Sequence, residues 1–116
     1  MTVDDLRVLI AKEISAAECA RAAGNEGRAR VHARRAAGVA AQMYHTVYYS
    51  IEPRLSGFRH LQRIAADENL PADLRAAAAR LTVRVTPEHT LPHADDPLED
   101  AQYLADALLA RLIQEH

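Results

Sequence analysis

Two stretches of the sequence place an arginine shortly before a histidine, a combination that could act on phosphate esters. Four residues separate Arg84 from His89, and five separate Arg54 from His60. An imidazole transfers protons near neutral pH, and a guanidinium stabilises the charge that develops on a phosphate in the transition state. A proline interrupts the first stretch and a glycine the second, so neither pair lies on one continuous helix face. We therefore favour neither pair as catalytic, and interpret the arginines as solvated helix ends and His60 as a helix-start residue bonded to a loop.

A second group of side chains offers ligand types that zinc accepts, namely His89 and His93 followed by Asp95 and Asp96. An i, i+4 histidine pair binds a metal when a helix aligns the two rings. Prolines precede both histidines, so no helix spans them, and Asp96 is better explained as a helix N-cap. The sequence therefore predicts no metal site here.

The rest of the chain lacks the motifs of the common cofactor sites. It contains no glycine-rich phosphate loop and no His-Glu-x-x-His pair. Cys19 is the one cysteine, which excludes an internal disulfide and a multi-cysteine metal site. We expect no cofactor.

The densest basic stretch consists of Arg28, Arg30, Arg34 and Arg35. Arginine binds phosphate groups through two parallel hydrogen bonds, so this stretch is a candidate site for anions or nucleic acid. No aromatic residue interleaves with these arginines, which gives no support for base stacking on single strands. The alternative is the solvated face of a long helix.

Most of the few aromatic residues follow this basic stretch. If the protein has a small-molecule pocket, its walls are expected to include Tyr44, Tyr48, Phe58 and His60. Tyr44 and Tyr48 lie one helical turn apart on a common face. The alternative is that they close the end of a helical bundle or a dimer seam, with their hydroxyls at its wet edge.

Composition defines the class of protein that must position these side chains. The chain has 116 residues, 49% of them hydrophobic and 26% charged, which excludes intrinsic disorder and fits one domain over residues 1–116. Aromatic residues make up only 4%, so the core must be built from aliphatic residues and alanine, which favours helices. The net charge of −2 gives no global attraction to nucleic acid. No apolar run is long enough to span a membrane, so we expect a cytoplasmic protein without membrane contact.

Apolar periodicity and capping residues predict five helices in an all-α, four- to five-helix up-and-down bundle. The expected helices run from Thr2 to Gly24, from Asn25 to about Tyr49, from Ser56 to about Asp67, from Pro71 through Val85, and from Asp96 through Ile113.

The second helix carries more apolar surface than one neighbour needs. Val31, Val39, Met43 and Val47 form one stripe, and a row of alanines and tyrosines lies beside it. We expect this helix to be central in the bundle or to take part in an oligomer interface.

The order of these elements resembles that of the HEPN superfamily. The shared features are a long helical hairpin rich in small residues, a break at Pro53, a short helix beginning with His60-Leu61, a proline-containing loop and an Ala/Leu-rich last helix. The resemblance implies a small helical bundle, frequent dimerisation, and a partner or substrate that involves nucleotides or RNA. Members of this superfamily occur beside nucleotidyltransferases and in toxin–antitoxin systems.

The resemblance leaves three functional hypotheses. We favour a non-catalytic interaction module that forms a homodimer or binds a nucleotidyltransferase. Catalytic HEPN members cleave RNA without a metal through an Arg-x4–6-His motif, so the alternative is a ribonuclease that uses Arg84 with His89, or Arg54 with His60. The third hypothesis is a structural bundle of unknown role, with a fully polar outer surface and a monomeric state.

Overall fold

The protein is all-α throughout the part of the chain that the computed structural model describes, residues 2–49, 56–83 and 96–114. Within these ranges there are helices and turns but no strand. The helices are α1 (Val3–Ala22), α2 (Glu26–Tyr49), α3 (Gly57–Ala66), α4 (Ala72–Leu81) and α5 (Pro97–Gln114).

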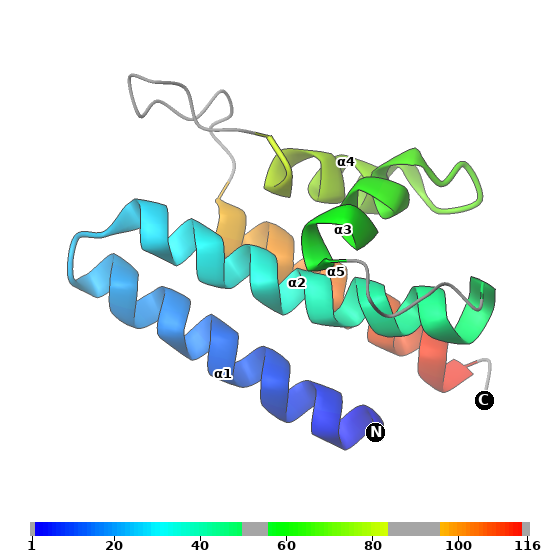
Figure 1. Ribbon diagram of the computed structural model, residues 1–116, viewed down its shortest axis with the longest axis horizontal. Helices are drawn as coiled ribbons and strands as arrows, with labels where there is room; N and C mark the ends of the chain where they lie inside the picture. The colour runs from blue at the N-terminus through cyan, green and yellow to red at the C-terminus, as the bar shows by residue number, and fades with distance from the viewer. Residues whose placement is uncertain (1, 50–55, 84–95, 115–116) are drawn as a thin grey trace.

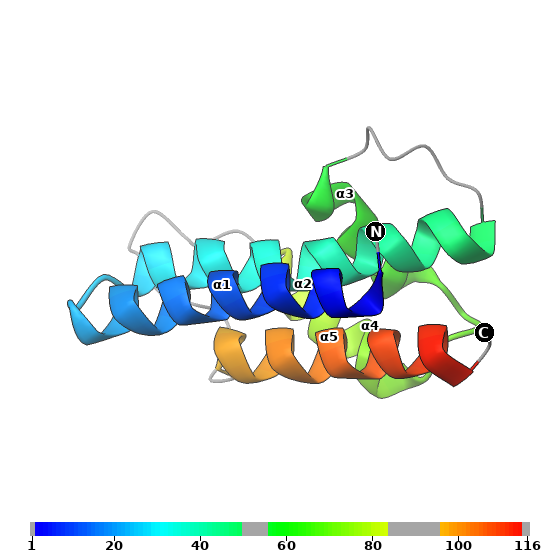
Figure 2. The ribbon, with the colours of Figure 1, turned by 90° about the horizontal axis from the view of Figure 1, so that it is seen from below.

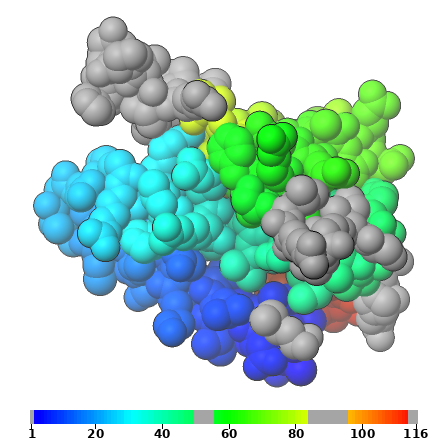
Figure 3. Space-filling model, in the orientation of Figure 1, coloured from blue at the N-terminus to red at the C-terminus, as the bar shows by residue number. Residues whose placement is uncertain are grey.

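Helix α2 lies at the centre and contacts α1, α3 and α5, as the width of its apolar surface predicts. Helices α1 and α2 form an antiparallel hairpin, α3 and α4 lie on the opposite side of α2 from α1, and α5 lies behind (Figure 1). The space-filling view shows α1 and α2 as one continuous face (Figure 3). The up-and-down order holds for α1 and α2, whereas α5 runs parallel to α2 because the two short helices return the chain between them (Figure 2).

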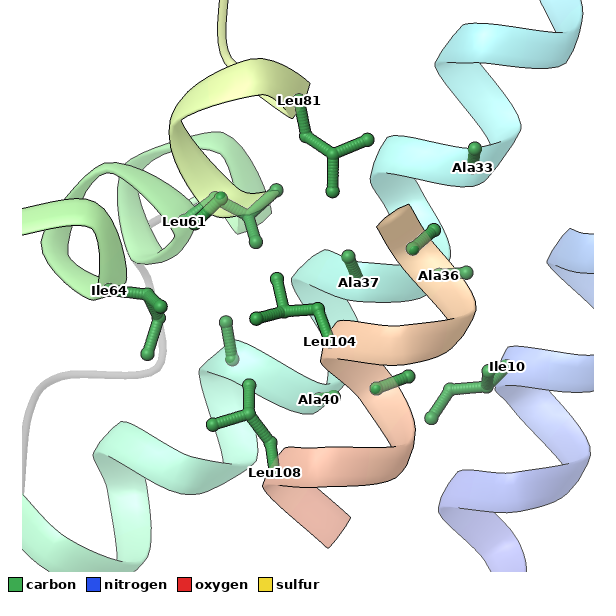
Figure 4. Close-up of a cluster of buried hydrophobic side chains, with 14 of the residues drawn as sticks. Ile10, Ala33, Ala36, Ala37, Ala40, Leu61, Ile64, Leu81, Leu104 and Leu108 are labelled. Carbon is green, nitrogen blue, oxygen red and sulfur yellow. The ribbon is translucent and has the colours of Figure 1, made fainter. Parts of the chain in front are cut away.

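The buried surface of α2 is made mainly of alanine. Large aliphatic side chains from α3, α4 and α5, including Leu61, Leu81 and Leu104, point toward this surface (Figure 4). Methyl side chains allow the neighbouring backbones to approach closely, and the leucines fill the remaining space. The alanines that are fully buried on α2 are Ala29, Ala33, Ala36, Ala37, Ala40 and Ala41.

The structure thus corrects the sequence interpretation of the stripe on α2. Val31, Val39 and Met43 are only partly buried, and Val47 is exposed. A helix surrounded on three sides must be narrow, so its smallest residues, rather than its largest, face the core.

The predicted starts of the first three helices are confirmed, and the fourth begins at Ala72, one residue after the predicted Pro71, which is its N-cap. The Thr2 hydroxyl accepts a hydrogen bond from the Asp5 amide, and the Asp5 carboxylate accepts one from the Thr2 amide. Asn25 and Ser56 accept from amides in the first turns of α2 and α3. Gly24 follows α1 with φ 81°, a left-handed conformation that favours glycine and ends the helix.

The predicted end of the fourth helix is wrong. Helix α4 ends at Leu81 rather than continuing through Val85, which lies outside the described residues. The Thr82 hydroxyl donates to the carbonyls of Ala78 and Ala79, and the Arg30 guanidinium binds carbonyls just beyond. These side chains satisfy the carbonyl groups that a further helical turn would use.

Helices α2 and α3 meet at two glycines. A Cβ atom at Gly38 would lie 2.9 Å from the Cα of Gly57, closer than real Cβ contacts allow. The two backbones are therefore in direct contact, and this contact fixes where α3 begins on α2.

We predict that Gly38→Ala lowers the free energy of unfolding by about 1 to 3 kcal/mol, because overpacking against the Gly57 backbone outweighs the higher helix propensity of alanine. Gly27→Ala is the matched control. A Cβ there has only a side-chain oxygen within reach, at 3.8 Å, so we expect about 0.5 kcal/mol of stabilisation. Urea unfolding of both variants measures the difference. Equal stabilisation of the two would contradict the close approach of α2 and α3.

Asp96 begins α5 and also joins it to α1. Its carboxylate accepts from the Leu98 amide at 2.9 Å and binds the Arg21 guanidinium through two hydrogen bonds of 2.8 and 3.0 Å. The bond from Arg21 lowers the pKa of the Asp96 carboxyl below its usual value. Arg21 also pairs with Glu26 at the start of α2, so one guanidinium connects three helix ends.

We expect Asp96→Ala to destabilise the protein by about 1 to 2 kcal/mol, because it removes both the cap and a partly exposed ion pair. Asp96→Asn keeps a capping oxygen and loses only the charge, so its effect should be less than about 1 kcal/mol. Thermal unfolding followed by circular dichroism separates the two contributions. An unchanged melting temperature in Asp96→Ala would show that the start of α5 is not held in this way.

Candidate functional site

Two histidines meet inside the protein, between α2 and α3. The Nδ1 atoms of His45 and His60 lie 2.8 Å apart, and their ring centroids are separated by 5.1 Å. His60 is fully buried and His45 is 2% exposed. Because two bare nitrogens would repel at this distance, one shared proton must lie between the two Nδ1 atoms.

Burial keeps this pair neutral. It lowers the pKa of His45 to about 4, and the neighbouring His60 and Arg63 act in the same direction. Burial also lowers the pKa of His60, again with a contribution from Arg63. Nε2 of His60 is buried and has no hydrogen-bond partner within the described ranges. A bare lone pair there costs less than an unpaired N–H, which favours His60 as the donor and His45 as the acceptor.

This geometry bears on the two arginine–histidine pairs. His60 has one ring nitrogen bonded to His45 and the other sealed inside the protein, so neither faces solvent in this structure. A general base must come within hydrogen-bond reach of the proton it takes. Arg54, Arg84 and His89 lie outside the described residues, as do His93 and Asp95.

The aromatic residues proposed as pocket walls lie in three separate settings. Tyr44 is buried with its ring centroid 4.7 Å from that of Tyr48, whose hydroxyl donates to the Arg111 carbonyl. Phe58 is half-buried beneath the Arg34 guanidinium, and His60 is paired with His45. Tyr44 and Tyr48 thus pack where α2 meets the end of α5.

A cavity of about 290 Å³ lies beside His45, between α2 and the end of α3. Its described lining is His45, Tyr49, Arg63, Ala66, Asp67 and Asn69. The Tyr49 hydroxyl donates to the Asp67 carboxylate at 2.9 Å, so these two polar groups of the cavity lining already bind each other. The lining contains none of the four residues that the sequence suggested.

The four arginines of the basic stretch have different surroundings. Arg30 is buried, and its Nη2 donates to the carbonyls of Arg80 and Val83 at 2.7 and 2.8 Å, where it caps α4. Arg34 lies over the Phe58 ring at 5.4 Å, a cation–π distance. Arg28 and Arg35 are exposed on α2.

An open groove of about 830 Å³ lies between α1 and α5. These helices run antiparallel side by side (Figure 2). The buried residues Ile10, Ile14, Ala105 and Leu109 form its floor, the exposed small residues Ala11, Ser15 and Ala110 lie along it, and Arg7, Glu18 and Asp106 are its exposed charged residues. The groove is lined by Arg7, Ile10, Ala11, Ile14, Ser15, Glu18, Gln102, Ala105, Asp106, Leu109, Ala110 and Ile113.

Sequence reasoning missed this groove and the partner of His60. The groove could have been found from α1, where exposed small residues lie between the buried positions Ile10, Ile14 and Ala17. His45 is not among the candidate residues that the sequence analysis names. Its contact with His60 depends on how α3 packs, which no local spacing encodes.

The described residues include no cluster of three or more histidine, cysteine or acidic side chains placed to hold a metal ion. Within the same ranges, none of the helices is both long and apolar enough to cross a membrane. Comparison of the chain with known protein families, curated proteins and solved structures finds no match. The fold class therefore rests on the structure, and the function must be argued from the site.

The histidine pair makes stability depend on pH. In the unfolded chain a histidine has a pKa near 6.5, whereas folded His45 has a pKa of about 4. As the pH falls from 6.5 toward 4, the unfolded chain binds protons that the folded chain does not, so stability is lost over this window. Between pH 7 and 5 we expect a loss of about 2 kcal/mol from His45 alone.

The double variant His45→Leu/His60→Leu tests this pH dependence. It removes both histidines together, so that neither buried imidazole is left without its hydrogen-bond partner. Urea unfolding at several pH values should show a smaller acid loss between pH 7 and 5 in this variant than in the wild type, by at least about 2 kcal/mol, because both histidines have a lowered pKa. Equal pH dependence of the two proteins would contradict the burial of neutral histidines.

Proposed function

We propose that this protein is a non-catalytic, HEPN-like helical interaction module that forms a homodimer and acts with a nucleotidyltransferase or another nucleotide- or RNA-handling protein. The observation that best supports a role in interaction is the groove between α1 and α5. Its apolar floor is open to solvent, and Ile113 on its rim is 49% exposed. A groove of this kind between two helices suits a further helix.

The exposed apolar side chains near this groove also argue against a purely structural bundle with a polar surface. Val8 on α1 and Tyr103 on α5 are 61% and 45% exposed. Single exposed apolar residues are common, but their presence on both helices that form the groove, together with Ile113 in its lining, fits an interaction surface.

The surroundings of His60 support a non-catalytic role over the ribonuclease alternative. A histidine that holds a buried partner and has no exposed nitrogen is suited to a structural task, the joining of α3 to α2. This argument applies to the Arg54–His60 pair. For Arg84 with His89, the proposal rests on the proline within that stretch.

The nucleotide-handling partner is supported by the HEPN-like order of the helices. Direct contact with nucleic acid would fall mainly to Arg28 and Arg35, because Arg30 is already used to cap α4. With a net charge of −2 the chain has little general attraction for RNA, so we expect recognition through a protein partner.

Two measurements on the purified protein test this proposal. Sedimentation equilibrium between 1 and 200 µM should show a monomer–dimer equilibrium, and incubation with single-stranded RNA in EDTA should leave the RNA intact. A monomer across this range would contradict the dimer. Cleavage that is lost in His60→Gln or His89→Gln, with an unchanged melting temperature, would overturn the non-catalytic assignment.

A further inference from the structure

One face of α1 carries a seam that is complementary to itself. The seam consists of Arg7, Ala11, Ile14 and Glu18, all of which line the groove. Their spacing of four, three and four residues is the spacing of a coiled-coil seam, which keeps one stripe directed at a partner helix. The middle of the seam is apolar, with the small Ala11 exposed and Ile14 on the groove floor at 8% exposure, and its two ends carry opposite charges.

A second copy of α1 that runs antiparallel across a two-fold axis fits this seam. With the axis between residues 12 and 13, Arg7 faces Glu18 of the partner subunit, and Ala11 faces Ile14 of the partner subunit. The symmetry generates each pair twice, as a two-fold interface requires. Arg7 and Glu18 are exposed, and neither forms an ion pair within the part of the chain described here.

Small side chains make this approach feasible. Ala11 and Ser15 are exposed on α1, so another helix can come close without displacing large groups. The partner's α1 would lie in the groove, against both α1 and α5. Val8 lies one turn before Ala11 and two turns before Ser15, on the outer flank of the seam, and would then face α5 of the other subunit. This contact gives its 61% exposed side chain an apolar neighbour.

We infer that the occupant of the α1–α5 groove is α1 of a second copy of this chain, packed antiparallel with Arg7 paired to Glu18 of the partner subunit. This inference deepens the proposed function and rests on its dimer. The groove is lined by 12 residues, fewer than the roughly 20 to 30 a side of a standard interface. The dimer should therefore be weak, with a dissociation constant on the order of 10 µM.

Charge exchange along the seam tests the register. Arg7→Glu and Glu18→Arg each create two like-charge contacts, so each should weaken dimerisation about tenfold or more in sedimentation equilibrium at low salt. The double variant recreates both pairs with reversed polarity and should restore the dissociation constant to within about threefold. Arg35→Glu makes the same charge change at an exposed position of α2, away from the groove, and should have little effect.

The single cysteine supplies an independent measurement of geometry. Cys19 is exposed on α1, and in this register the two copies lie about 20 Å apart along the helix axes, at 1.5 Å per residue. Spin labels on Cys19 should give an interlabel distance of about 20 to 30 Å by pulsed electron resonance. Parallel helices in register would bring the labels much closer together.

The outcomes separate this inference from the proposed function. A wild-type dimer that is weakened by either charge reversal, restored by the double variant and labelled at the expected distance supports both. A dimer that is insensitive to both reversals and to Ala11→Arg, with melting temperatures unchanged, overturns the interface but leaves the dimeric module intact. A wild type that is monomeric up to 200 µM overturns both.

Discussion

Alanine on the buried surface of α2 sets how closely the other helices can approach it, and the arrangement of the whole bundle depends on that distance. Helices α1, α3 and α5 all contact α2, and a central helix with large side chains would hold them apart. The approach is closest at Gly38, where the backbone of α2 contacts the backbone of α3 at Gly57. Most of the large buried apolar side chains are then supplied by the helices around α2, for example Leu104 and Leu108 of α5.

Close approach of α3 also explains the histidine pair. His60 lies one turn after Gly57 on α3. The contact between Gly57 and Gly38 therefore brings the His60 imidazole against α2. A lone buried imidazole would leave polar atoms without partners, and His45 satisfies one of them. The two histidines therefore form one buried hydrogen bond that joins α3 to α2 within an otherwise apolar contact. Burial favours the neutral form of both imidazoles. Arg30 has a comparable role at the other short helix, where it binds the carbonyls that end α4.

The sequence predicts the helices well because their ends are determined locally. Thr2, Asn25, Ser56 and Asp96 each have side-chain oxygens that cap a helix, and Gly24 has the conformational freedom that ends one. The end of α4 is predicted too late because it depends in part on Arg30, fifty residues earlier in the chain, and no local spacing encodes that contact. The roles of His45, of His60 and of the arginines depend in the same way on long-range packing. Periodicity could indicate which residues share a face, but not which of two faces on α2 would be buried.

The arrangement of α1 and α5 follows from the same constraint and leads to the open groove. Both helices pack on α2, and they are joined to each other by Arg21 and Asp96 at one end. Away from this ion pair, small exposed residues such as Ala11, Ser15 and Ala110 lie along the groove, and the space above its buried isoleucine and leucine floor stays open. Among the described residues, α1 and α5 therefore leave an open groove between them. Because the α1 side of that groove carries Arg7 and Glu18 at its two ends, it is complementary in charge to an antiparallel copy of itself, which is why we propose a second copy of α1 as its occupant.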